Sequence, residues 1–229
     1  MTISTPLIRA WSLFAALAFF CGFAFSQDIS LLPKYGNGQK SEQQKAADAE
    51  FLSQVDARYP GDRPKAAKEV SDRGWQLLRQ GNLADAMRRF NQAWLIDPKS
   101  VPSLWGMAAV SSYSDQGLLT SLSLFAEAEK LAPDNLDLAV DYAKAIGIAA
   151  SVVGNPTLMA EAVRRYEVIY KKAPSHTLNL QNWAIADYTS GNYAMAWTHL
   201  KLAEATPQRA DIDPNFVKAL EAKMPRPAN

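Results

Sequence analysis

The chain has 229 residues, of which 24 are basic and 23 acidic, so its formal net charge is +1. This balance gives no general argument for a nucleic acid or an anionic membrane surface as partner, because both favour a basic excess. An apolar fraction of 48% excludes wholesale disorder, and the length suffices for one sizeable domain or one elongated array.

Residues 1–26 have the pattern of a signal peptide. Arg9 is the only charged residue among them, an apolar run over residues 10–25 follows it, and the run ends in Ala24 and Ser26, small residues two apart. A signal peptidase requires this arrangement, so we expect cleavage after Ser26 and export, with the periplasm as the expected compartment and no integral membrane segment afterwards. The alternative is an uncleaved membrane anchor, since the run lies at the short edge of the about 17–25 residues that a spanning helix needs.

Cys21 is the only cysteine of the chain. Phe19 and Phe20 before it are too bulky for the small residues that lipoprotein processing usually requires, which disfavours lipid attachment at this position. Cleavage after Ser26 would remove both Arg9 and Cys21. The mature chain is therefore expected to carry about no net charge, to lack disulfides and to be held together by its core alone.

Residues 27–62 are expected to contain a leader and an N-terminal helix. The leader, residues 27–40, is rich in turn residues and indicates a mobile segment. Residues 41–59 favour a helix whose apolar side chains recur every four positions, at Ala47, Phe51, Val55 and Tyr59. We interpret it as an N-terminal cap; the alternative is a helix that binds a partner or forms a dimer.

Residues 63–210 carry an internal repeat. Three residue types recur 35 positions apart, Phe90, Ala93 and Pro98 as Phe125, Ala128 and Pro133, and two positions recur at 34, Ala162 and Tyr166 as Ala196 and Leu200. Two turns contain a glycine that can end one helix and an asparagine that can cap the next, Gly81-Asn82 and Gly191-Asn192. The prolines that close the second helices are Pro98, Pro133, Pro174 and Pro207. This period is typical of a helix-turn-helix unit.

These residues resemble the tetratricopeptide repeat (TPR) family. The first repeat fits the family pattern at Gly74, Gly81, Ala86, Phe90, Ala93 and Pro98, while Leu77 stands where tyrosine is commoner. Four repeats are expected, at about residues 67–100, 102–135, 136–174 and 177–210, and the third is about seven residues too long. Its first helix is expected to run on from Leu136 through Val153, with Asn155 capping the next helix.

The resemblance covers about 145 residues and implies an all-α fold, a right-handed superhelical array of antiparallel helix pairs with N- and C-terminal capping helices. Residues 211–229 are expected to form the C-terminal cap and tail. Asp213 begins its helix, and three apolar side chains share one face of it, Phe216, Leu220 and Met224.

Side chains suited to catalysis are few. The two histidines, His176 and His199, have no carboxylate or second histidine at metal-ligand spacing in the sequence, and no glycine-rich phosphate loop, nucleophile elbow or paired-cysteine motif occurs. We therefore expect neither an enzyme, nor a metal site, nor a cofactor.

In TPR arrays the first helices of successive repeats line a concave groove, and the resemblance implies that partner contacts lie there. The candidate groove residues are Lys68, Ser71, Trp75, Tyr113, Lys144, Gln181 and Tyr188, with Leu78, Ser103, Gly106, Val110, Asp137, Val140, Asp141 and Ile185 on the same faces. Core packing is the alternative for Trp75 and Tyr188. Ser71 and Trp75 stand where some TPR groups carry a basic and asparagine carboxylate clamp, so the groove is expected to be flatter, apolar and aromatic.

The favoured function is an exported scaffold that binds a protein or peptide segment in this groove and supports a process of the cell envelope. A second hypothesis is a structural subunit that self-associates as a homo-oligomer through the helix at residues 41–59. A third is a small-ligand carrier or enzyme on helical repeats, in which the long third repeat forms a pocket wall.

Overall fold

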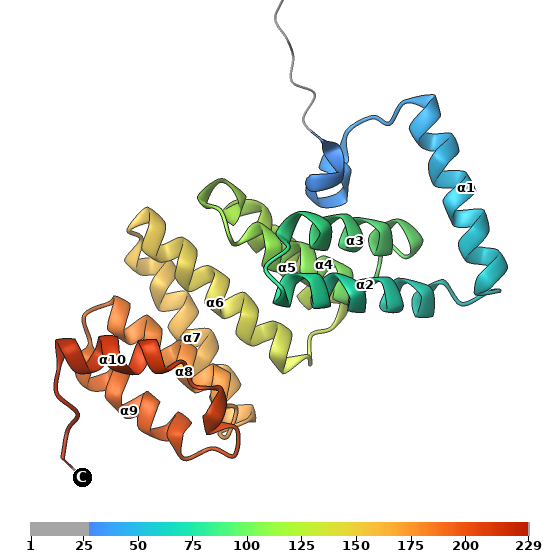
Figure 1. Cartoon of the computed structure of the whole chain (residues 1–229). Coiled ribbons are helices and arrows are strands. Elements are labelled where there is room, and N and C mark those ends of the chain that lie inside the picture. Colours follow the sequence, from blue (N-terminus) through green and yellow to red (C-terminus); the bar gives the residue numbers. More distant parts are fainter. Residues whose placement is uncertain (1–27, 229) are drawn as a thin grey trace, which may run out of the picture.

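The helices of the computed structural model form four consecutive antiparallel pairs (Figure 1). The structure describes residues 28–228, so the expected signal peptide lies outside the described residues. The pairs are α2/α3, α4/α5, α6/α7 and α8/α9, with α1 before and α10 after them. Their bounds are α1 Glu42–Arg58, α2 Arg63–Arg79, α3 Leu83–Ile96, α4 Val101–Ser111, α5 Leu118–Leu131, α6 Leu136–Val153, α7 Pro156–Lys172, α8 Thr177–Thr189, α9 Tyr193–Glu204 and α10 Pro214–Lys223. The expected all-α array of helix pairs is confirmed.

The turns within the pairs are made by the residues that the sequence singles out. Gly81 and Gly191 take the left-handed conformation, with φ of +77° and +79°, and end α2 and α8. The side-chain oxygen of Asn82 accepts a hydrogen bond from the Asp85 N–H at the start of α3. Asn155 caps α7 in the same way through the Leu158 N–H. The extra residues of the long third repeat lengthen both of its helices, since α6 has 18 residues and α7 has 17, against 11 in α4 and 14 in α5.

The joint between the first two repeats is built on Phe90. Its ring is fully buried and lies against two glycines, Gly74 of α2 and Gly106 of α4. A Cβ atom at these glycines would come within 2.6 and 2.2 Å of the ring, so only glycine permits this approach. Gly106, expected on the groove face, is therefore a core position.

The C-terminal cap closes the last repeat with an apolar face. Phe216 and Leu220 of α10 are buried with Leu200 and Trp197 of α9, and the Trp197 indole N–H donates to the Met224 carbonyl at 3.0 Å. This contact leaves the end of α9 covered, as a terminal repeat requires.

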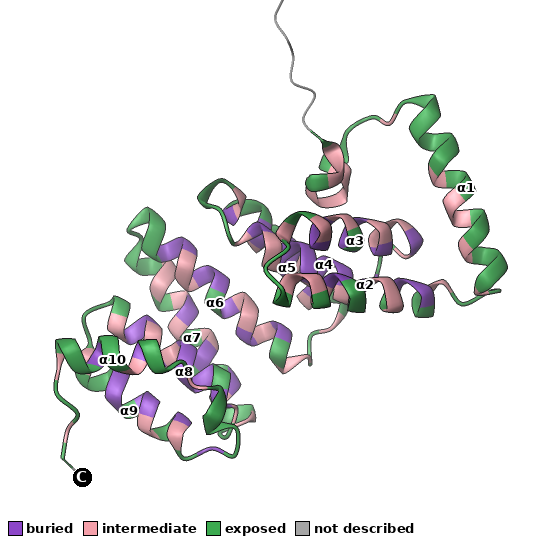
Figure 2. Ribbon diagram, in the orientation of Figure 1, coloured by how far each residue is buried: buried purple, intermediate pink, exposed green. Residues whose placement is uncertain are grey.

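α1 is attached far more loosely. It has no fully buried residue and is green along most of its length in Figure 2. Phe51, Val55 and Tyr59 are half-buried against a small cluster on α2 and α3, while Ala47 is exposed. Three of the four side chains that define the expected capping face thus make the contact.

The expected mobile leader is instead docked on the repeats. Residues 28–37 form two short 3-10 turns, η1 Ile29–Leu31 and η2 Pro33–Asn37, that lie against α3 (Figure 1). The buried Asn91 side chain of α3 donates to the carbonyl oxygens of Ser30 and Leu32. Local sequence could not reveal this, because the partners lie about 60 residues away in the chain.

Among residues 28–228 no helix has both the length and the apolar character that a membrane span needs.

The Phe90 joint predicts opposite effects for one substitution at two glycines. Gly106→Ala forces a methyl group into the Phe90 ring and should lower the free energy of unfolding by about 1–3 kcal/mol. Gly147→Ala is the matched control, because its Cβ would meet only Ala162 Cβ at an ordinary 3.7 Å. In the middle of α6 it should stabilise by about 0.5–1 kcal/mol. Urea unfolding of both variants measures this, and a neutral Gly106→Ala would contradict the proposed joint.

Candidate functional site

The first helices of successive repeats contact one another, α2 with α4, α4 with α6 and α6 with α8, and so form a continuous inner surface. Two neighbouring hollows lie along it. The first, of about 300 Å³, is lined by Trp75, Leu78, Ala109, Ser112, Tyr113, Phe125, Asp141, Lys144, Ala145 and Ile148. The second, of about 230 Å³, is lined by Lys144, Gly147, Ile148, Ser151, Val152, Met159, Tyr166, Asn182, Ile185, Ala186 and Thr189.

Five of the expected groove residues line the first hollow: Trp75, Leu78, Tyr113, Asp141 and Lys144. Tyr113 follows the end of α4 and is 68% exposed, the state of a side chain free to contact a partner. Lys144 is exposed on α6 and borders both hollows. Within residues 28–228 no carboxylate lies within 4.0 Å of its ammonium group, although its charge acts on the Asp141 carboxyl in the wall of the first hollow.

Trp75 serves both the core and the surface. Its ring makes edge contacts with Phe90 and Trp105, at centroid distances of 5.4 and 5.2 Å, and it is only half-buried. Both interpretations of this residue therefore apply, since the core contacts fix the ring while its remaining surface lines the hollow.

Asp141 places a carboxylate in the wall of the first hollow. The indole N–H of Trp105 on α4 donates to Asp141 Oδ2 at 2.8 Å. Burial raises the pKa of the Asp141 carboxyl above its ordinary value, although this hydrogen bond and the charge of Lys144 partly oppose the rise. The contact joins α4 to α6 and fixes the angle between the second and third repeats.

Other expected groove residues lie elsewhere. Ser71 is fully buried and Gln181 is 8% exposed, so neither is presented at the surface. Gln181 instead accepts the Asp213 N–H at the entry to α10, at 2.6 Å. Lys68 pairs with Asp72 one turn further along α2.

Tyr188, the last expected residue, is held by the C-terminal cap. Its ring contacts Phe216 of α10 edge-on, at a centroid distance of 5.9 Å, and Tyr193 of α9 at 5.5 Å. Because α10 occupies this end, the accessible hollows lie over α2, α4, α6 and the Ile185 side of α8.

The second hollow is built largely by residues that sequence reasoning did not select. The C-terminal half of α6 contributes Gly147, Ile148, Ser151 and Val152, and α7 contributes Met159. The unusual length of the third repeat was the sequence feature that could have indicated these residues of the second hollow. Tyr166, a buried residue of α7, also borders this hollow, and its burial raises the pKa of the phenol.

Both histidines have carboxylate partners, which lie 39 and 12 residues away in the sequence and outside metal-ligand spacing. His176 Nε2 lies 3.0 Å from Asp137 Oδ1, and His199 Nδ1 lies 2.7 Å from the buried Asp187 Oδ2. The His199 ring also stacks on Trp183 at 3.8 Å between centroids. Each pair joins two helices, and among the described residues no three potential metal ligands of the His, Cys, Asp or Glu type gather together.

Comparisons with known proteins yield structural likeness at low sequence identity. No family model and no curated protein sequence match the chain. The crystal structure of MamA is 14% identical, with a TM-score of 0.49 over 76% of this chain and 98% of that one. A MamA fragment from Desulfovibrio magneticus RS-1 is 15% identical, with a TM-score of 0.48 over 71% and 85%.

The TPR protein YrrB, described as having an unusual peptide-binding site, is 16% identical, with a TM-score of 0.34 over 75% of this chain and 97% of that one. Since all of these TM-scores lie below 0.5, the fold described above rests on the helix packing itself and not on these likenesses.

The buried carboxyl of Asp141 predicts a pH-dependent difference between two variants. Because burial raises its folded-state pKa, the wild-type chain loses stability as pH rises from the ordinary value through the folded pKa. Asp141→Asn removes this loss while its amide oxygen still accepts from Trp105, so it should stabilise at neutral pH and have little effect near pH 3.8. Urea unfolding across this range tests it, with the exposed Asp134→Asn as control; equal effects of both variants would contradict the assignment.

Proposed function

We propose that the chain is an exported, non-catalytic scaffold that holds a protein or peptide segment on the inner surface of α2, α4, α6 and α8, in support of a process of the cell envelope. One observation carries the binding part of this proposal. Two mostly apolar hollows lie side by side along the first helices of all four repeats and share Lys144, an exposed cation that has no carboxylate within 4.0 Å in the described part of the chain.

The size of the hollows favours a segment over an enclosed small ligand. At about 230 and 300 Å³ they lie at or below the lower end of small-molecule sites, which span about 300–1,000 Å³. Each can receive one or two apolar side chains. A segment that lies along the surface can fill both hollows at once, and its contacts then add over a larger area.

The charge pattern defines the segment further. An acidic side chain between the two apolar anchors would meet Lys144, while Tyr113 offers an exposed aromatic ring at the rim of the first hollow. The bound segment is thus proposed to carry apolar or aromatic residues on both sides of an Asp or Glu. Export is supported by the pattern of residues 1–26 alone.

Site-specific photo-crosslinking in the native host tests the proposed surface. With the probe at Tyr113 or at the exposed Ser151, we expect a discrete adduct with another protein. The matched control is Lys130, an exposed residue on the second helix of the second repeat. Adducts of equal yield at all three positions, or none at Tyr113 and Ser151, would contradict a partner on the inner surface.

Charge reversal tests the role of Lys144. Lys144→Glu should weaken binding of the crosslinked partner on the order of fivefold, because a partly exposed ion pair contributes up to about 1 kcal/mol. Lys172→Glu makes the same charge change on the exposed side of α7 and should leave the affinity unchanged. Isothermal titration of both variants with the identified partner measures this, and an unaffected Lys144→Glu would exclude an acidic group at this position.

A further inference from the structure

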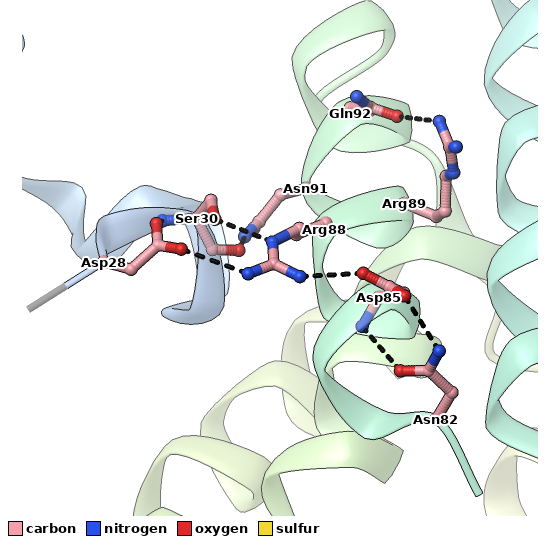
Figure 3. A network of polar contacts seen from close by, with 8 residues as sticks. All are labelled: Asp28, Ser30, Asn82, Asp85, Arg88, Arg89, Asn91 and Gln92. Atoms are coloured by element: carbon pink, nitrogen blue, oxygen red, sulfur yellow. Dashed lines mark hydrogen bonds and ion pairs between the residues drawn. The ribbon is translucent and has the colours of Figure 1, made fainter.

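Residues 28–34 occupy a built site on α3 and α5. Asn91 donates from its single amide nitrogen to two backbone carbonyls, Ser30 at 2.9 Å and Leu32 at 2.8 Å. Arg88 extends from the same helix to Asp28 Oδ2 and Ser30 Oγ, both at 3.2 Å, and also pairs with Asp85 of α3 (Figure 3).

The far end of the segment is held by Lys34. Its ammonium group pairs with Glu127 of α5, and its backbone N–H donates to the sulfur of Met107 at 3.4 Å. The Lys34 side chain is 16% exposed, so this ion pair is more shielded than most surface pairs. Contacts of the segment thus reach both the first and the second repeat.

The site requires an occupant. Asn91 is fully buried on α3, and its Oδ1 has no partner in the described structure even with the segment docked. Without the carbonyls of residues 30 and 32, its amide nitrogen would lose both of its partners as well, which is unfavourable for a buried polar group. Any chain that presents the same two carbonyls satisfies this requirement equally, whether it comes from the same molecule or another.

The backbone that leads from the docked segment towards α1 is strained. Four consecutive residues take the left-handed conformation: Lys34, Tyr35, Gly36 and Asn37, with φ of 53°, 55°, 71° and 53°. Three of them are not glycine, and each such residue is disfavoured on the order of tenfold relative to an ordinary conformation. The closed arrangement therefore contains a strained hinge. Extension of residues 35–41 would relieve this strain, at the loss of the contact of the Lys40 ammonium group with the Tyr35 ring, at 4.1 Å, and of the Lys40–Asp48 ion pair.

The helix that follows the hinge opposes an opening only weakly. α1 has no fully buried residue and is held through half-buried side chains such as Phe51 and Val55. Seven extended residues, 35–41, reach about 24 Å, which allows the segment to leave its own α3 while α1 stays in place.

We propose that residues 28–34 exchange between two copies of the chain, so that each copy's segment docks on the α3 and α5 surface of the other. The contacts with Arg88, Asn91 and Glu127 are then the same as in the closed monomer, and the hinge strain is released. Exchange of identical elements through a short strained hinge is a low-cost route to a dimer. This self-association uses the side of α3 and α5 and reaches the inner surface only at Tyr113, which borders residues 31–33 as well as the first hollow.

A charge exchange at the Lys34–Glu127 pair tests the proposal with the full chain. Lys34→Glu alone and Glu127→Lys alone each face a like charge in the closed monomer and in their own dimers. In an exchanged dimer that contains one copy of each variant, both contacts between positions 34 and 127 bring opposite charges together. Native mass spectrometry with one copy isotopically labelled should therefore find mixed dimers in excess over both homodimers, by at least about fivefold.

The double variant Lys34→Glu, Glu127→Lys restores the pair within one chain and is the control, expected to behave as wild type. Mixed dimers in merely statistical proportion would place the association on another surface, and a mixture that stays monomeric up to the solubility limit would exclude exchange. Both results overturn the proposal.

Two hinge variants give opposite predictions and leave Arg88, Asn91 and Glu127 unchanged. Gly36→Ala adds a side chain to a left-handed residue and brings its Cβ to 3.0 Å from Leu32 in the closed form. It should tighten dimerisation on the order of tenfold for each hinge. Asn37→Gly relaxes the closed form and should weaken dimerisation several-fold, because glycine adopts this conformation freely. Sedimentation analysis measures both constants, and shifts in the same direction would contradict the hinge.

Discussion

The approach of Phe90 to two glycines is the constraint on which the first half of the array depends. With the ring seated against Gly74 and Gly106, α2 and α4 each approach the Phe90 ring of α3 more closely than residues with a Cβ would allow. Trp75 stands edge-on to both Phe90 and Trp105, and Trp105 reaches Asp141 on the next repeat. The packing of Phe90 at the joint between the first two repeats is therefore connected, through Trp75 and Trp105, to Asp141 in the wall of the first hollow.

The two faces of the array have different tasks. The inner face has two shallow apolar hollows around Lys144, which suit contact with a segment of another protein. The outer face of the first repeats is covered by the chain's own residues 28–34, through the buried amide of Asn91. The two surfaces meet at Tyr113, which borders both the first hollow and the docked residues 31–33.

The ends of the array explain why the groove is shorter than its repeats. α10 buries Phe216 against the last pair and contacts Tyr188 and Gln181, so the fourth repeat contributes mainly Ile185 and Thr189 to the accessible surface. At the other end α1 buries little, which leaves the N-terminal half of the molecule more open to rearrangement than the C-terminal half.

The sequence by itself determined the helix pairs, their turns and their period, because glycine, asparagine and proline act on their immediate neighbours. It also selected Trp75, Tyr113 and Lys144, which the fold brings into one hollow. Tertiary structure decided the rest: the burial of Ser71, the carboxylate partner of each histidine, and the docking of residues 28–34. These features depend on contacts between residues far apart in the chain, and the pattern of residues within one helix does not predict such contacts.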